Sequence, residues 1–518
     1  MLAMRRLVVL LGFLGLFFAA ASVDARPGGG SSFRGGSSSR SSGSSSRSSG
    51  SSYSGGSYSG GSSYRSTGTG GSMGIGGVIT MLVLFAIVAV IVNVAKSKAQ
   101  GAGWTAGHGP MNAADFFPQR PMTAPVPQVS ARKELERLRE VDPGFSLVVF
   151  DDFVGALYSE VLLARGRGEL MKLTAYLAPP AFDWLGKRPL DGLTTVLVGA
   201  LSLHSARGLE ASSPRVTVEV DIESNLSRRD AQTGQEQALY VKERWTLGRV
   251  KTAKSRTPDK ARVFACPNCG APLSEIFGGK CRHCGQNVAS GAFDWVVESI
   301  FVETTEARGP MLTGTTEEEG NDLPTVFDPN VQQTFTALQQ KDPALEWTAL
   351  TARMNLIFQT FQRAWSTRDL TAMRPYLSDA LFTTQSFWVN EYLRQGLQNM
   401  TENAQLHSVE LSRVTTDAFF DAVTVRIWAS SLDFTLNDRD GKVVAGSRTK
   451  PRKYTEYWTF IRSSRAKGPP KTESACPRCG APLSVNMGGQ CTYCQAKVTT
   501  GDFDWVLSRI EQDDVYVG

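Results

Sequence analysis

The eight cysteines of the chain fall into two sets of four with identical spacing. Each set contains two C-x-x-C pairs separated by eleven residues, and the sets begin 476 − 266 = 210 residues apart. Two residues between thiolates let both sulfurs of a tight turn face one ion, and two such turns complete a tetrahedron. We therefore predict one structural zinc ion per set, two in all, with these ligands: Cys266, Cys269, Cys281 and Cys284, then Cys476, Cys479, Cys491 and Cys494.

Neighbouring residues support this assignment. Gly270 and Gly480 follow the first turn of each set, where a backbone that bends towards the sulfurs suits glycine. His283 is a less suitable ligand, because the second set has Tyr493 at the matching position and four thiolates already fill the shell. We expect His283 to lie on the surface.

Two disulfides per set or a thioredoxin-like redox pair are the alternatives to zinc. A redox C-x-x-C works as a single pair in a strand–helix context, whereas here two pairs recur at a fixed distance. A closed shell of four sulfurs leaves zinc no open position for a substrate, so a structural role is expected. Such binding contributes about 10–16 kcal/mol in small zinc peptides. The purpose stays open, because zinc ribbons serve nucleic-acid binding, protein binding and bracing.

The elements that position these cysteines must belong to several domains. A chain of 518 residues is too long for one core. The net charge of +6 is small for this length and gives no case by itself for a nucleic-acid-binding protein, and four histidines leave little room for imidazole chemistry.

The N-terminal part has three segments of distinct composition. Residues 1–25 have a basic start and an apolar run, which is typical of a secretory signal peptide, with an uncleaved anchor as the alternative. Residues 26–74 are rich in glycine and serine and are expected to be disordered. Residues 75–95 carry no charge and are long enough to span a hydrocarbon layer of roughly 30 Å, so we predict a transmembrane helix.

The orientation of this helix follows from the residues after it. Lys96 and Lys98 favour a cytoplasmic C-terminal side. Whether residues 1–25 are cleaved or retained, everything after Lys96 is left on the inner side. Eight free thiolates also require a reducing compartment. We therefore predict a bacterial inner-membrane protein with a single span and its C-terminal domains in the cytoplasm.

The rest of the chain contains a large repeat. Residues 141–182 align without gaps to residues 341–382, an offset of 200 that grows to 210 at the cysteines. The residues that coincide include Asp142/Asp342, Pro143/Pro343, Tyr176/Tyr376, Leu177/Leu377 and Phe182/Phe382. Each half is therefore expected to be one globular unit with one ribbon, present twice.

The pattern within each unit predicts helices followed by strands. In the second unit, Met354, Ile357, Phe358, Phe361 and Trp365 recur at helical spacing and predict a buried stripe. A short helix should end near Tyr376, and Ser378 or Asp379 should cap a third that carries Phe382, Tyr392 and Leu393. Alternating strands follow, at Val216–Ile222 and Val423–Ile427, with a turn at Asp440–Gly441. This order predicts an α+β domain with helices on one face of a curved sheet.

The predicted boundaries are these: signal peptide 1–25, disordered Gly/Ser-rich segment 26–74, transmembrane helix 75–95, linker 96–130, first domain 131–264, first zinc ribbon 265–300, linker 301–334, second domain 335–465, and second zinc ribbon with the C-terminal segment 466–518.

The stretch FQRAWSTRDLTAMRPYLSDALF, followed by a strand-rich half with EYWTF, resembles the C-terminal domain of the mitochondrial inner-membrane translocase subunit forty-four and its bacterial relatives. The resemblance covers residues 335–464 well and 141–248 more weakly. Together with the N-terminal segments and the CPxCGAPL ribbons, the chain looks like the bacterial zinc-ribbon transport proteins. The resemblance implies two tandem cone-shaped domains of the nuclear-transport-factor-two-like fold, a module that binds partner proteins or lipid surfaces, and a role in protein transport.

No catalytic constellation is evident. His204 and His407 do not occupy matching positions, and no carboxylate pair or partnered nucleophile is found. Four aromatic residues, Tyr176, Phe182, Tyr376 and Phe382, either line the mouth of an apolar pocket or pack in the core. We predict a membrane-anchored, non-enzymatic adaptor or scaffold for a protein partner that the sequence does not identify. The alternatives are a hydrolase or isomerase that uses the cone pocket and a membrane-tethered nucleic-acid binder.

Two basic runs, residues 251–262 and 447–453, bear on the partner. They are either solvated hairpin tips or contacts to anionic lipid, where each Lys or Arg near the surface contributes about 1 kcal/mol. Neither run contains an aromatic residue on which a base could stack, so nucleic acid is an unlikely partner.

Overall fold

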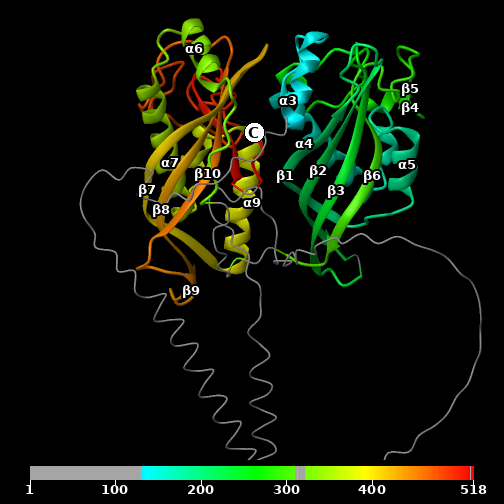
Figure 1. The fold of residues 1–518 in the computed structure, drawn as a ribbon. Helices are drawn as coiled ribbons and strands as arrows, with labels where there is room; N and C mark the ends of the chain where they lie inside the picture. Colours follow the sequence, from blue (N-terminus) through cyan, green and yellow to red (C-terminus); the bar gives the residue numbers. More distant parts are fainter. Residues whose placement is uncertain (1–129, 231, 310–311, 313–320, 514) are drawn as a thin grey trace, which may run out of the picture. The chain divides into compact units, whose positions relative to one another are not determined.

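The computed structural model describes residues 130–230, 232–309, 312, 321–513 and 515–518 (Figure 1). The predicted signal peptide, Gly/Ser-rich segment and transmembrane helix lie outside the described residues, as does most of the linker 96–130. Within the described ranges, no helix combines the length and the apolar composition needed to cross a membrane. Helices and antiparallel sheets occur in both halves, so the predicted mixed α+β class is confirmed.

The first half places its helices before its strands. The helical elements are α3 (Ala131–Glu136), η2 (Arg137–Glu140), α4 (Leu147–Gly166), η3 (Leu170–Leu173) and α5 (Pro179–Gly186). The sheet strands are β1 (Leu193–Arg207), β2 (Arg215–Arg229), β3 (Glu236–Val250) and β6 (Val296–Glu306), antiparallel in the order β1-β2-β3-β6. Shorter elements lie between β3 and β6: η4 (Pro258–Lys260), η5 (Leu273–Glu275), β4 (Ile276–Phe277) and β5 (Lys280–Cys281).

Helix α4 packs one side of this sheet. Ser146 caps the helix by accepting a hydrogen bond from the Val149 amide at 3.3 Å. The predicted alternation in β2 is confirmed, because Val216, Val218, Val220 and Ile222 are all fully buried. The core therefore lies between α4 and the face of the sheet that these residues share.

The second half has the same order of elements. Its helical elements are α6 (Val331–Lys341), α7 (Trp347–Thr367), α8 (Leu370–Met373), η6 (Arg374–Tyr376) and α9 (Asp379–Gln395). Its strands are β7 (Leu397–Thr416), β8 (Phe420–Asn437), β9 (Val443–Gly446), β10 (Arg452–Ser463) and β11 (Val506–Gln512). The sheet order is β11-β10-β8-β7, and β9 pairs with β8.

The helices predicted for this half are confirmed. The stripe Met354, Ile357, Phe358, Phe361 and Trp365 on α7 is at most 2% exposed. The predicted cap is also present, since the Ser378 hydroxyl accepts from the Leu381 amide at 3.4 Å at the start of α9. Helix α9 carries Phe382, Tyr392 and Leu393 as predicted, and Leu393 is 48% exposed. It lies one position after the buried Tyr392, so the helical turn carries it off the packed face.

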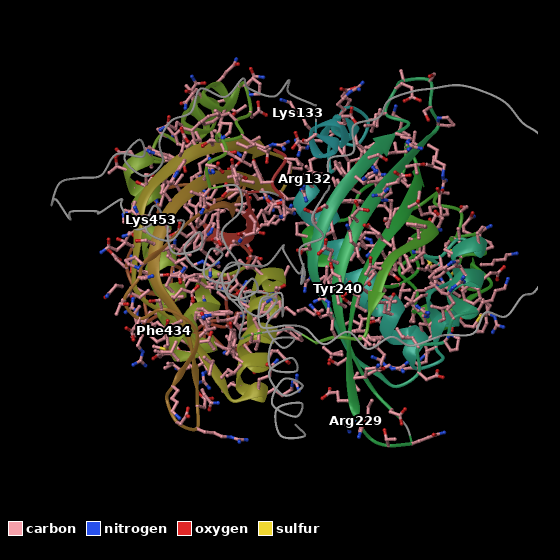
Figure 2. All side chains as sticks on the ribbon, turned by 60° about the horizontal axis from the view of Figure 1, so that its bottom comes forward. Arg132, Lys133, Arg229, Tyr240, Phe434 and Lys453 are labelled. Carbon is pink, nitrogen blue, oxygen red and sulfur yellow. The ribbon has the colours of Figure 1, made fainter. Side chains whose placement is uncertain are left out.

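The hairpin predicted at Asp440–Gly441 is present between β8 and β9. The Gly441 amide donates to the Asn437 carbonyl at 2.8 Å, and Gly441 has a φ of 66°, a conformation that glycine adopts without steric cost. Figure 2 shows the side chains of both sheets, with Arg229 at the hairpin end of β2 and Phe434 on β8.

The ribbons are inserted into the sheets. Strand β6 follows the first cysteine set and pairs with β3, the strand before that set. Strand β11 follows the second set and pairs with β10 in the same way. The sequence had suggested that each ribbon follows a completed domain, with the ribbon segment starting at residue 265 or 466. The structure instead places each ribbon between two neighbouring strands, so the last strand of each sheet comes after the cysteines.

Candidate metal centres

The four sulfur atoms of each cysteine set lie within 4.8 Å of one another. In each set the first and fourth cysteines, and likewise the second and third, have Sγ–Sγ distances of 3.9 to 4.0 Å: Cys266–Cys284, Cys269–Cys281, Cys476–Cys494 and Cys479–Cys491. At a Zn–S distance of about 2.3 Å, the sulfurs of a tetrahedral site are roughly 3.8 Å apart. A disulfide requires about 2.05 Å, and all eight thiols are free. The clusters could therefore hold metal ions, and their geometry is consistent with zinc.

Matching backbone hydrogen bonds form the turns that carry the sulfurs. In the first set, the Gly270 amide donates to the Cys266 carbonyl and the Cys266 amide to the Ala271 carbonyl, both at 2.8 Å. The second C-x-x-C turn repeats the pattern from Cys281, where the Gly285 amide donates at 2.8 Å.

The second set has the same bonds, with the Gly480 amide on the Cys476 carbonyl at 2.9 Å and the Gln495 amide on the Cys491 carbonyl at 2.9 Å. Gly270 and Gly480 have φ values of 75° and 74°, so the expected conformational reason for glycine at these positions is confirmed.

Tyr176 and Arg256 hold the first ribbon against its unit. The Tyr176 hydroxyl donates to the Ala265 carbonyl at 2.6 Å, immediately before the first cysteine. Arg256 donates to that hydroxyl at 2.7 Å and to the Asp294 carboxylate at 2.5 Å. Burial raises the pKa of Asp294 even though Arg256 opposes the shift. The backbone on both sides of this ribbon is thus held by one half-buried arginine.

A different arginine holds the second ribbon. Arg374, in η6, donates to the Met487 carbonyl of the ribbon at 2.9 Å and to the Asp379 carboxylate. Asp379 also accepts from Lys497 and from the Thr499 hydroxyl, both of which lie in the ribbon. Burial acts to raise the pKa of Asp379, but Lys497 and Arg374 outweigh it, and the pKa lies below its ordinary value.

A buried ion pair lies beside the tryptophan that follows each cysteine set. Arg249 on β3 pairs with Asp142 at 2.7 Å, and Arg462 on β10 pairs with Asp342 at 2.8 Å. All four side chains are at most 4% exposed. Each guanidinium also lies over the indole of the F-D-W motif that follows the cysteines, with the carbon 4.9 Å from the Trp295 ring centre and 4.8 Å from that of Trp505.

Sequence reasoning found the two aspartates of these pairs but not their partners. Asp142 and Asp342 coincide in the aligned repeat, whereas Arg249 and Arg462 lie on strands that the alignment did not reach. The signal that could have found them is an arginine four residues after the tryptophan of a Trp-Thr pair, which occurs once on β3 (Trp245) and once on β10 (Trp458).

The other residues singled out from the sequence have structural positions. Tyr176, Tyr376 and Phe382 are at most 6% exposed, which supports core packing over a pocket mouth. His283 is exposed, as expected. His407 Nε2 lies 2.8 Å from the Ser430 hydroxyl, and His204 Nδ1 lies 3.4 Å from Asp221.

The two basic runs are not simply solvent-exposed hairpin tips, because some of their side chains form internal contacts. Lys251 is 8% exposed, and its ammonium donates to the Leu209 and Glu210 carbonyls at 3.0 and 2.7 Å. In the second run Arg452 pairs with Asp433 at 3.2 Å. Part of this charge therefore serves internal contacts.

Comparison with known families identifies one domain. Residues 331–471 match the family described as the Tim44-like domain, from α6 to the segment just before the second cysteine set. A similar solved structure is an "Ntf2 like protein involved in plasmid conjugation", with 9% identity, coverage of 70% of this chain and 92% of that chain, and a TM-score of 0.17. A likeness of that extent carries no inference. No curated relative matches the chain.

Proposed function

We propose that this chain, whose residues 331–471 form a Tim44-like domain, is a membrane-anchored adaptor that binds a protein partner during transport across or into the membrane. The match to that family carries the proposal. Tim44-like domains are associated with protein transport and are in general not catalytic. The adaptor would act by presenting a surface.

The second part of the proposal concerns the architecture that presents this surface. Both halves carry helices on an antiparallel sheet and a four-cysteine cluster between the last two strands. We assign both halves to one duplicated, cone-shaped domain type with the nuclear-transport-factor-two-like fold. Two such domains on one anchor would give the chain two presenting surfaces.

Zinc would brace these domains. The eight cysteines would hold two ions, and each ion would supply a fixed tetrahedral centre without an open position for substrate. Because each ribbon connects neighbouring strands, the ions would fix the point at which the last strand joins its sheet. The metal would thus stabilise the presenting surface.

The sequence supports a location for the proposed adaptor. Residues 75–95 supply the proposed anchor of a bacterial inner-membrane protein, and the thiolates fit the reducing side of that membrane. Anionic lipid next to the anchor would be the second contact, through the remaining exposed basic residues.

Site-specific crosslinking in native membranes tests the adaptor proposal. A photoreactive amino acid is placed at Leu393 on α9 or at Val443 on β9, which are 48% and 42% exposed. A third position, Met171 in the first half, which is 53% exposed, tests the other proposed surface. We expect the same protein to be captured reproducibly from a position in the Tim44-like domain and to be lost when Cys476 and Cys479 are both replaced by serine.

The crosslinking results distinguish the adaptor from the alternative nucleic-acid binder. Capture of one partner that depends on the second ribbon supports the adaptor. Failure to capture any reproducible partner from either position in the Tim44-like domain would refute it. Crosslinks to nucleic acid alone would favour the tethered nucleic-acid binder, and their loss with increasing salt would identify phosphate contacts.

A further inference from the structure

The first half contains a cavity of about 470 Å³ that the adaptor proposal does not use. Its walls come from α4, the segment around the end of α5, and strands β2, β3 and β6. Leu226, Leu239, Val241 and Ile300 supply an apolar lining and are at most 9% exposed. This volume falls within the range of about 300–1,000 Å³ that is typical of small-molecule sites.

A carboxyl group lies among these apolar residues. Glu243 on β3 lines the cavity and is 4% exposed. Its Oε2 accepts a hydrogen bond from Trp245 Nε1 at 3.0 Å, and it also interacts with the hydroxyl of Tyr158. Tyr158 in turn lies 2.7 Å from the Ser224 hydroxyl. Burial raises the pKa of Glu243, which favours the protonated carboxyl that can donate a hydrogen bond.

Two guanidinium groups line the more exposed part of the cavity. Arg188 lies over the Trp184 ring, with its guanidinium carbon 4.3 Å from the ring centre. Arg165 Nε donates to the Arg188 backbone carbonyl at 2.5 Å, and the Arg165 guanidinium carbon lies 5.9 Å from the centre of the same Trp184 ring. Among the described residues, neither guanidinium forms an ion pair with a carboxylate. Burial lowers the pKa of Arg165, and the negative charge of nearby Glu243 offsets this only in part, so a ligand anion beside Arg165 would further stabilise the charged guanidinium.

The second half lacks this combination at the matching positions. Glu456 also accepts from a tryptophan, Trp458, at 2.8 Å, but its other oxygen accepts from Gln512 at 3.0 Å. Gln512 is the cross-strand neighbour of Glu456 on β11, whereas Val302 has that place opposite Glu243. The glutamate of the second half is thus satisfied by its own sheet.

The long helices of the two halves also differ, because polar residues of α4 that are near the cavity are replaced by apolar aromatic residues in α7. At the offset of 200, Phe358 replaces Tyr158 and Trp365 replaces Arg165. Both aromatic residues are at most 2% exposed and belong to the core of the second half. The polar groups are therefore a property of the first half rather than of the repeated fold.

We propose that the cavity of the first half binds a small amphipathic anion that carries a second, uncharged hydrogen-bonding group. The acid group pairs with Arg165 and Arg188, the apolar body lies along the leucine and isoleucine side chains, and the uncharged group meets Glu243 and Tyr158. This site is separate from the cysteine clusters and does not depend on the adaptor proposal.

The position of Glu243 decides against a plain aliphatic acid as the preferred ligand. With its acid group at the arginines, such a molecule would place a methyl group against the carboxyl and the tyrosine hydroxyl. A ligand displaces the water that was bound to the polar groups of its site. If those groups gain no hydrogen bond from the ligand in return, affinity is lost. A terminal hydroxyl or carbonyl avoids that cost.

Isothermal titration of the full chain in lipid nanodiscs tests the proposal with two probes, octanoic acid and its ω-hydroxy derivative. Heats from empty nanodiscs are subtracted. We expect the hydroxy acid to bind about five- to tenfold more tightly, as one additional hydrogen bond permits. Partition into the lipid cannot produce this preference, because the hydroxy acid is the more polar molecule.

Substitutions test which residues bind the acid group of the ligand and which bind its hydroxyl group. Arg165→Met and Arg188→Met should each weaken both acids about tenfold. The matched control Arg167→Met removes an exposed arginine beyond α4 that does not line the cavity, and it should change neither. Glu243→Leu should abolish the preference for the hydroxy acid. Glu243→Gln should retain it, because the amide still donates, and it also shows that the fold tolerates replacement here.

Three results would overturn the proposal. One is no heat above that of empty nanodiscs for either acid. Another is equal affinity for the two acids in the unaltered chain. The third is an affinity that Arg165→Met and Arg188→Met leave unchanged.

Discussion

At the scale of single residues, the contacts with the largest expected effect on stability are the two buried ion pairs, Asp142–Arg249 and Asp342–Arg462. Asp142 accepts from Arg249 and also from the Ser255 amide at 2.9 Å and its hydroxyl at 2.6 Å. An arginine this deeply buried depends on its partner, because an uncompensated charge inside a protein is costly.

The first prediction concerns the loss of one partner. Asp142→Ala leaves the Arg249 guanidinium buried and unpaired, and we expect the free energy of unfolding to fall by about 3–5 kcal/mol, as judged by the midpoint of urea unfolding. Arg207→Ala is the control, because Arg207 is 72% exposed in its ion pair with Glu219. A loss for Asp142→Ala no greater than for Arg207→Ala would contradict this account.

Glu243 gives the second prediction, a pH dependence. Because burial raises the folded-state pKa of Glu243 above 4.5, the stability that the protonated carboxyl contributes is complete below pH 4.5 and is lost as the pH rises through the folded-state pKa. Glu243→Gln does not titrate. The unfolding free energy of the unaltered chain should therefore decline relative to that of Glu243→Gln as the pH is raised.

Denaturant unfolding across this pH window measures the difference. Glu236→Gln, an exposed position on the same strand, controls for the removal of one carboxyl. A difference between the unaltered chain and Glu243→Gln that stays constant with pH would be incompatible with a raised pKa.

At the scale of elements, the ribbons depend on turns that only certain residues can form. Gly489 in the second ribbon has a φ of 78°, and an added Cβ would lie 2.3 Å from the Thr499 hydroxyl oxygen. Its neighbour Gly488 has no such conformation, and the nearest atom to an added Cβ is at 3.3 Å.

This pair gives the third prediction. Gly489→Ala should destabilise the second half by about 1–3 kcal/mol through backbone strain and the displacement of Thr499, whereas Gly488→Ala should have a much smaller effect. Thermal unfolding of the two variants provides the measurement. Equal melting temperatures would show that the turn tolerates a side chain.

The fourth prediction concerns the metal. The purified chain should contain two zinc ions, and replacing Cys266 and Cys269 by serine should reduce this to one while the second set retains its ion. Elemental analysis by mass spectrometry determines the stoichiometry. Two ions in that double variant, or none in the unaltered chain, would exclude the assignment of one structural zinc per set.

The sequence predicted these elements unevenly. The α7 stripe and the β2 alternation could be assigned because an amphipathic period reports directly which side chains are buried. The cysteine clusters could be assigned because their spacing alone sets a coordination geometry. The strands β6 and β11 were missed, since pairing between strands on either side of a ribbon is long-range. The cavity around Glu243 was missed too, because it depends on which residue stands opposite on β6.

At the scale of the whole molecule, the described residues between 130 and 518 form the two halves with helices and antiparallel sheets, and residues 75–95 form the predicted anchor. The fifth prediction tests this division. The full chain should remain with the membrane after carbonate extraction, and deletion of residues 75–95 should release it. A reporter that is active only in the cytoplasm should work when fused after Gly518. Activity restricted to a reporter of the outer side would invert the proposed orientation.

The insertion of each ribbon between neighbouring strands has a consequence for zinc-starved cells. Without the ion, β6 and β11 would lose the anchor point that brings them to β3 and β10, and those two strands would present unpaired backbone amides and carbonyls at a sheet border. Such borders recruit strands from other molecules. Zinc shortage would then lead to self-association of the apoprotein, which chaperones or proteases would have to remove.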